Sequence, residues 1–327
     1  MLELNMSSSQ EQANVSTFPE IPSQKPVSIL PSVYALLQNA RVLIRHGEDQ
    51  LALNLLRQAS TSQSHEIIFE EMAHVLIRLG KWDEAKKVVE QWYRLSTNFR
   101  VCFCKAQIEY ELQMNEKSLQ SYFEALSYII EAQPELFEIF KNIGNIYVRR
   151  SDFESAEEFY NKAYAVRPNS DILLVNYGIL EMQRGDLNRA KDRFRSALHI
   201  NDQNDKAWVG LAMVHFDFGD EELGVANLKK ALDLAPHNKT AIHFALQKMS
   251  HRQYSAYMIE ALERFLDQSE FDEEISCQLI QKFYEVGKLD LAHLEAQRLF
   301  LWAPENPEYE GLFQEVEKQM QVREQAA

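Results

Sequence analysis

The stretch 171–204, DILLVNYGILEMQRGDLNRAKDRFRSALHINDQN, decides the fold of this 327-residue chain. Aligned on Gly178, its features return 34 residues away in each direction. The preceding copy, 137–170, reads FEIFKNIGNIYVRRSDFESAEEFYNKAYAVRPNS, and the following copy, 205–238, reads DKAWVGLAMVHFDFGDEELGVANLKKALDLAPHN. A period of this length indicates a repeat protein in which each unit packs on its neighbours.

Each copy carries the signals of two helices joined by a tight turn. Large apolar residues at positions 4, 7, 11 and 24 recur at helical spacing and predict one buried face per helix. Gly185 suits the left-handed end of a first helix, and Asp186 can cap the second. Small residues at positions 8 and 20 would let the two helices approach closely; these are Gly144, Gly178, Ala212, Ala156, Ala190 and Gly224. The chain is therefore predicted to be all-α.

This 34-residue helix–turn–helix pattern resembles the tetratricopeptide repeat (TPR) family. The resemblance implies an α-α superhelix, a right-handed TPR solenoid, over most of the chain. We expect eight repeats, at 33–65, 66–99, 100–136, 137–170, 171–204, 205–238, 239–272 and 273–306. Residues 307–322 read as a C-terminal capping helix, followed by a short tail at 323–327. The Ser- and Pro-rich segment 1–32 is predicted to be a disordered N-terminal tail.

Two repeats depart from the pattern. Repeat 100–136 is three residues longer than the others and is expected to place Gln107 and Leu119 at the close-approach positions. Repeat 239–272 has Leu246 and Met258 there. Larger side chains at these positions predict wider helix spacing and a local change in the pitch of the superhelix.

Composition and motifs exclude several classes of function. A formal net charge of −15 argues against a nucleic-acid partner, because phosphate binding needs concentrated Lys and Arg. No apolar run approaches the roughly 20 residues that cross a bilayer, so no membrane insertion is expected. The polar N-terminus and three cysteines, expected as free thiols, favour the cytoplasm. The sequence carries no nucleotide, cofactor or metal motif, so we expect no cofactor, no metal and no catalytic residue.

In TPR proteins the first helix of each repeat lines a concave groove through positions 2, 5, 6 and 9. Here those positions place Lys141 and Asn145, then Asn176, then Lys206 in consecutive repeats. This resembles four of the five positions of the carboxylate clamp of TPR cochaperones, and the fifth falls at Gly210. Ammonium and amide donors can hold a carboxylate by charge-assisted hydrogen bonds. The whole predicted binding groove comprises Lys141, Asn142, Asn145, Arg149, Asn176, Gln183, Lys206, Val209, Met213 and Phe216.

The sequence thus predicts a non-enzymatic scaffold or adaptor that binds an acidic or amphipathic segment of a partner protein. Bacterial regulatory and polarity or motility complexes, including those around small GTPases and response regulators, use such scaffolds. Secretion and pilus assemblies do so as well. The alternative is a TPR chaperone or cochaperone that recognises a C-terminal carboxylate or a secretion client. A third hypothesis is an enzyme, or an enzyme regulator, that acts on a small molecule or a signalling peptide.

Overall fold

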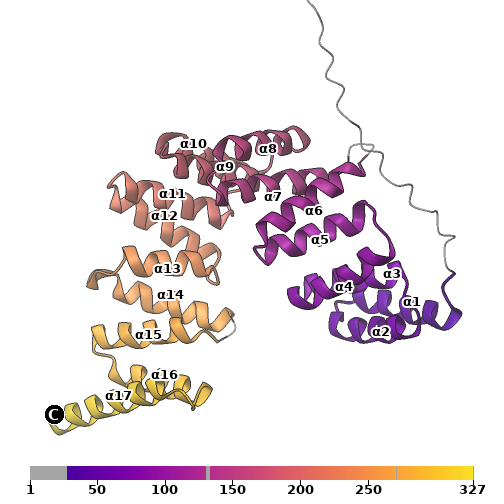
Figure 1. The fold of residues 1–327 in the computed structure, drawn as a ribbon. Helices are drawn as coiled ribbons and strands as arrows, with labels where there is room; N and C mark the ends of the chain where they lie inside the picture. The colour runs from indigo at the N-terminus through magenta and orange to yellow at the C-terminus, as the bar shows by residue number, and fades with distance from the viewer. Residues whose placement is uncertain (1–27, 130–132, 270, 327) are drawn as a thin grey trace, which may run out of the picture. The chain divides into compact units, whose positions relative to one another are not determined.

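The computed structural model describes residues 28–129, 133–269 and 271–326, and within these ranges every regular element is a helix (Figure 1). The first six are α1 (Pro31–Arg45), α2 (Asp49–Ser62), α3 (Glu66–Arg78), α4 (Trp82–Leu95), α5 (Phe99–Glu111) and α6 (Asn115–Ser127). The next six are α7 (Glu135–Arg149), α8 (Phe153–Val166), α9 (Asp171–Arg184), α10 (Leu187–Ile200), α11 (Asp205–Asp217) and α12 (Glu221–Leu234). The last are α13 (Lys239–Lys248), a 3₁₀ turn η1 (Arg252–Tyr254), α14 (Ser255–Gln268), α15 (Glu273–Val286), α16 (Leu289–Trp302) and α17 (Pro307–Ala326).

The chain divides into two compact parts after Ala125, a point inside α6. We call them the N-terminal body and the C-terminal body. In the N-terminal body a single apolar core runs from Val33 to Ala125. In the C-terminal body successive helix pairs such as α7 with α8 and α9 with α10 pack face to face. Its largest core cluster extends from Val209 to Val316. This is the all-α TPR solenoid fold that the repeat pattern predicts.

The predicted turn and capping chemistry of the central repeats is confirmed. Gly185 ends α9 with φ at +83°, in the left-handed region where a side chain is disfavoured. The Asp186 carboxylate accepts a hydrogen bond from the Arg189 backbone N–H at 3.0 Å and so caps α10. Gln113 and Ser151 occupy the equivalent turn position with φ at +56° and +59°, so the hairpin geometry prevails over the preference for glycine.

The small residues allow close helix approach in the way that their spacing predicts. A Cβ atom added at Gly144 would lie 2.4 Å from the Tyr160 ring of α8. One added at Gly178 would lie 2.6 Å from Phe194 of α10, and one added at Gly210 would lie 2.4 Å from the same ring. Phe194 is completely buried. The Phe194 ring therefore fills the space between α9, α10 and α11, because Gly178 and Gly210 have no side chains to occupy it.

The expected register of repeat 100–136 is wrong by one residue. Ala106 and Ser118, both completely buried, occupy the close-approach positions instead of Gln107 and Leu119. The Ser118 hydroxyl donates a hydrogen bond to the Ala106 carbonyl at 2.9 Å. The cause lies at the start of α5, where the Asn98 side chain accepts from the N–H groups of Arg100 and Val101 and begins the helix one residue earlier.

Repeat 239–272 is irregular at a different point. Helix α13 has only 10 residues, against 13 to 15 in the first helices of the other repeats, and η1 stands between it and α14. Met258 is completely buried, whereas Leu246 is only partly buried. The larger side chains thus accompany a shortened first helix. The wider helix spacing and the change of pitch stay predictions.

Both ends of the helical array depart slightly from the expected boundaries. Helix α1 begins at Pro31, inside the segment expected to be a tail, and Gln63 binds the chain just before it. The Gln63 side chain accepts from the Leu30 N–H at 2.9 Å and donates to the Ser28 carbonyl at 3.0 Å. The predicted disorder of residues 1–27 lies outside the described residues. At the other end, α17 continues to Ala326, beyond the expected limit of the capping helix, and buries Val316.

Asparagines at the start of first helices connect neighbouring repeats of the C-terminal body. The Asn204 carbonyl oxygen accepts from the Ala207 N–H at 3.0 Å and caps α11, while its amide donates to Asp171 at 2.9 Å. Asn238 repeats this arrangement one repeat later, with Asp205 as its acceptor at 2.6 Å. Burial alone would raise the pKa of Asp171, but hydrogen bonds from Asn204 and Asn201 outweigh burial and lower it.

We expect Asn204→Ala to lower the free energy of unfolding at pH 7 by about 1–2 kcal/mol, because it removes a helix cap and a donor to Asp171. The lowered pKa of Asp171 stabilises the fold above the ordinary carboxyl pKa, and this contribution is lost as the pH falls through the folded-state value. The difference in the free energy of unfolding between wild type and Asn204→Ala should therefore become smaller below about pH 4. Urea titrations at pH 7 and pH 3.5 measure this difference. Asn204→Ser keeps a capping oxygen without the amide donor; an equal deficit for Asn204→Ala at both pH values would contradict the link to Asp171.

Candidate binding face

Helices α7, α9 and α11 carry the residues that the sequence predicts for binding. Lys141 of α7 forms an ion pair with Glu138 one turn away on the same helix. Its ammonium also lies 5.8 Å from the centre of the Phe137 ring, and 14% of the side chain is exposed. The Lys141 charge is therefore partly neutralised by its own helix, through an i,i+3 pair whose spacing is visible in the sequence.

The structure brings Asn145 and Asn176 together. The side-chain oxygen of Asn145 accepts a hydrogen bond from the side-chain amide of Asn176 at 2.9 Å, although the two residues are 31 positions apart. The same oxygen accepts from the Tyr160 hydroxyl at 2.8 Å. These contacts fix an amide pair across α7 and α9, and α8 supports it. Sequence reasoning identified both asparagines but missed Tyr160, since position 24 of the repeat signals only a large apolar residue.

The other predicted residues divide by exposure. Asn142 and Val209 are buried, with 8% and 6% of their surface exposed, so neither offers its side chain to a partner. Arg149, Gln183 and Lys206 are exposed. Lys206 forms no ion pair or hydrogen bond with any residue that the structure describes. The accessible polar part of the predicted site is therefore smaller than expected, and it lies on three successive first helices.

The apolar part of the predicted site belongs largely to the packing of the repeats. Phe216 lies over Gly224, where an added Cβ would come within 2.9 Å of its ring. It also meets Phe244 of α13 edge to face, with ring centroids 5.6 Å apart. Lys248 covers both rings, and its ammonium lies 5.4 Å from the centre of the Phe216 ring. Phe216 and Met213 are partly buried and present only part of their surfaces.

The geometry does not assemble a complete carboxylate clamp. Gly210, at the fifth clamp position, is packed against Phe194 and has no side chain to offer. Lys141 is engaged by Glu138. Of the four clamp-like residues, Asn145 and Asn176 contact each other through the hydrogen bond described above.

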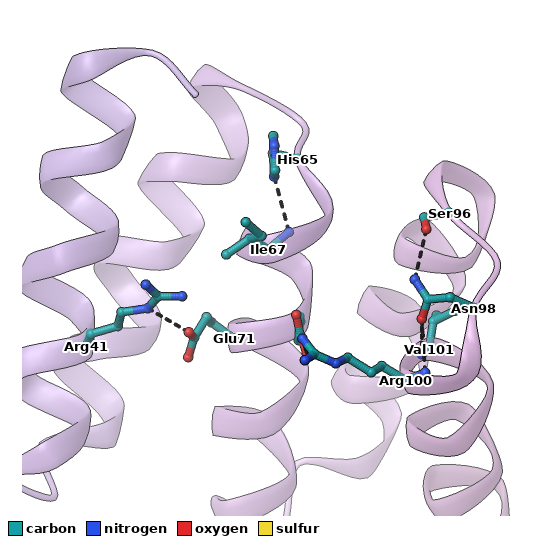
Figure 2. A network of polar contacts seen from close by, with 9 residues as sticks. Arg41, His65, Ile67, Glu71, Ser96, Asn98, Arg100 and Val101 are labelled. Carbon is teal, nitrogen blue, oxygen red and sulfur yellow. Dashed lines mark hydrogen bonds and ion pairs between the residues drawn. The ribbon is translucent and has the colours of Figure 1, made fainter. Parts of the chain in front are cut away.

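In the N-terminal body the first helices pair with one another through charged side chains (Figure 2). Arg41 of α1 donates to Glu71 of α3 at 2.8 Å, and Arg100 of α5 donates to Glu70 of α3 at 3.3 Å. The two residues of each pair are 30 positions apart in the sequence, which is slightly less than one repeat. These acidic and basic groups of α1, α3 and α5 neutralise one another, whereas Lys206 of α11 has no such partner among the described residues.

Two further features bear on the class of site. Across the described ranges no group of three or more His, Cys, Asp or Glu side chains has the arrangement of a metal site. No helix of the described chain is both long enough and apolar enough to cross a membrane.

Comparisons with known proteins agree with the repeat architecture. Residues 138–170 and 177–239 match models of the tetratricopeptide repeat, whereas a search of curated proteins finds no match. A tetratricopeptide repeat protein from Parabacteroides merdae has a similar fold, with a TM-score of 0.54 and 16% identity, over 87% of this chain and 98% of that one. PilF of Pseudomonas aeruginosa gives a TM-score of 0.52 and 17% identity, over 66% of this chain and 97% of its own. PilW gives 0.57 and 14%, over 66% and 99%. Residues 138–170 and 177–239 therefore carry tetratricopeptide repeats, and the structural likeness shows that the chain has the fold of tetratricopeptide repeat proteins.

Proposed function

We propose that this protein is a non-enzymatic scaffold or adaptor that binds an extended segment of a partner protein along α7, α9 and α11. The Asn145–Asn176 hydrogen bond carries the proposal. It holds two polar side chains of consecutive repeats in a defined position on α7 and α9. The same two helices bear the exposed Arg149 and Gln183, and the next first helix, α11, bears the exposed Lys206. Polar groups that are fixed in advance reduce the ordering cost of binding.

The chemistry of these side chains favours an acidic or amphipathic partner segment. Arg149 and Lys206 are cationic, and Gln183 can donate to backbone or side-chain oxygens. The partly exposed surfaces of Met213 and Phe216 offer apolar contact on α11, the helix that also carries Lys206. An extended peptide with acidic side chains and an apolar anchor combines both kinds of contact.

A cochaperone that holds a C-terminal carboxylate is the alternative, and it has less support. Lys141 already has an acidic partner in Glu138, and Gly210 lacks the charge expected at the fifth position. Secretion or pilus assembly is one setting for the adaptor, and PilW, whose fold is similar, is described as a type IV pilus biogenesis factor. Regulatory complexes around a small GTPase or a response regulator are another setting. The free thiols of Cys102, Cys104 and Cys277 suit a reducing compartment such as the cytoplasm.

Fluorescence anisotropy with a set of labelled acidic and amphipathic peptides tests the proposal. For a peptide that binds wild type, we expect the triple substitution Arg149→Ala, Gln183→Ala and Lys206→Ala to weaken binding by about tenfold or more, because charge-assisted hydrogen bonds contribute roughly 1.5–3 kcal/mol each. Arg195→Ala is the matched control, since Arg195 is an exposed cation on the second helix α10.

The outcomes separate the two hypotheses. Equal binding by wild type and the triple variant would contradict the face proposed here. Amidation of the peptide C-terminus should leave the affinity unchanged, because the proposed contacts go to side chains and backbone along the segment. Loss of binding on amidation would instead support the cochaperone alternative, and Lys141→Ala should then have the same effect.

A further inference from the structure

A pocket of about 320 Å³ lies among α4, α5 and α6 of the N-terminal body, far along the sequence from the proposed binding face. The charged residues of its lining are Lys86, Glu90, Arg94, Lys105, Glu109 and Lys117. Ligand pockets in proteins are typically about 300–1,000 Å³ in volume. The pocket is thus large enough for a charged group together with part of the molecule that carries it.

The charge of this lining is opposite to that of the whole chain. Four lining residues are cationic and two are acidic, an excess of two positive charges, whereas the chain has a formal net charge of −15. The four cations, Lys86, Arg94, Lys105 and Lys117, come from three different helices. Their proximity therefore depends on the packing of the repeat and is not a consequence of one basic helix.

Most of these cations lack an acidic partner. Several basic side chains elsewhere in the N-terminal body are paired, for example Arg57 with Glu84 and Arg78 with Asp49, both at 2.5 Å. Lys86, Arg94 and Lys117, by contrast, form no ion pair or hydrogen bond with any residue in the described ranges. Unpaired cations at a pocket wall produce a positive potential that attracts an anion.

The remaining polar groups of the pocket are held in place. The Lys105 ammonium lies 4.6 Å from the centre of the Tyr93 ring, and the Tyr93 hydroxyl donates to Glu124 at 2.6 Å. Glu109, only 4% exposed, accepts a hydrogen bond from the Ser121 hydroxyl at 2.7 Å. The carboxylate of Glu109 therefore has a hydrogen-bond donor in Ser121, and the cations of the pocket are not needed to satisfy it.

We propose that this pocket binds the phosphate group of a phosphorylated ligand. A phosphate monoester carries about −1.5 to −2 charge at pH 7, which matches the excess of two positive charges in the lining. Its three oxygens accept hydrogen bonds from ammonium and guanidinium groups that approach from different helices. A polyanionic nucleic-acid backbone fits less well, because a pocket of this size neutralises one phosphate and the rest of the chain is acidic.

Titration calorimetry with the full chain tests this proposal, using O-phospho-L-tyrosine, glucose 6-phosphate and inorganic phosphate as probes. We expect saturable binding of at least one probe, about tenfold or more weaker in the Lys105→Gln/Lys117→Gln double variant. Lys87→Gln is the matched control, because Lys87 is exposed on α4 and does not line the pocket. Tighter binding of O-phospho-L-tyrosine identifies a phosphorylated side chain as the source of the phosphate, and tighter binding of glucose 6-phosphate identifies a small metabolite.

Four outcomes would count against phosphate binding in this pocket. Absence of saturable binding by all three probes would overturn the proposal, as would unchanged affinity in a double variant whose circular dichroism shows it to be folded. Equal binding of succinate, a dianion without phosphorus, would overturn the assignment to phosphate. If the cations served only to balance Glu90 and Glu109, the double variant would lower the thermal midpoint while no probe bound wild type, which also counts against the proposal.

Discussion

Replacement of Phe194 by alanine is expected to lower the free energy of unfolding of the C-terminal body by about 3–5 kcal/mol. Phe194 is completely buried, and its ring lies against Gly178 of α9 and Gly210 of α11. Neither glycine has a side chain that could move into the space left by the ring. The cavity would therefore stay largely open, which places the cost in the upper part of the usual range for core truncations. Urea unfolding, followed by circular dichroism, measures the loss.

The same contact predicts that Gly178 and Phe194 are energetically coupled. Gly178→Ala adds a Cβ atom 2.6 Å from the ring and should destabilise by about 1–3 kcal/mol through overpacking. In a Phe194→Leu background the smaller side chain leaves room, so the cost of Gly178→Ala should decrease. Leu223→Ala, at a site that is 47% exposed, serves as the control and should change stability by less than about 0.5 kcal/mol. Additive effects of the two core changes would show that the ring and the glycine do not constrain each other.

The repeat fold could be predicted because its determinants are local and periodic. Gly178 and Gly185 mark a close approach and a turn in sequence, and the structure assigns them those roles. The register of repeat 100–136 could not be predicted from spacing alone. Asn98 begins α5 one residue early, and a single side-chain cap thereby shifts Ala106 into the position expected for Gln107.

The candidate sites were harder to predict because a polar position does not reveal its partner. Sequence spacing places Lys141 on the first helix of its repeat but does not show that Glu138 pairs with it. Lys206 is also a lysine on a first helix, but it is exposed, whereas Lys141 is paired with Glu138. The pocket of the N-terminal body gave no sequence signal, since Lys86, Lys105 and Lys117 belong to three helices and share no periodic position.

Cys102 and Cys104 are expected to react with thiol reagents at least about a thousandfold more slowly than an ordinary thiol in the native protein at pH 8. Burial raises the pKa of both thiols to about 12; the charge and hydrogen bonding of Glu124 add to the effect at Cys102, and the charge of Glu70 adds at Cys104. A pKa three units above the ordinary value leaves about a thousandfold less thiolate, which is the reactive form. Both side chains are also inaccessible, at 0% and 2% exposed, so labelling additionally requires opening of the N-terminal body.

Cys277 provides an internal comparison for this prediction. It is partly exposed, and its pKa is raised by burial and by nearby acidic residues, with Glu273 the largest of these. Iodoacetamide should therefore modify Cys277 first, and slowly. Trypsin releases Cys102 and Cys104 together in the peptide 101–105, VCFCK, so mass spectrometry follows the two sites separately from Cys277. In urea all three thiols should react at similar rates, because unfolding removes the burial that suppresses the thiolate. Labelling of the 101–105 peptide as fast as Cys277 in the native protein would mean that α5 exposes its thiols in solution, contrary to the packing seen in the core of the N-terminal body.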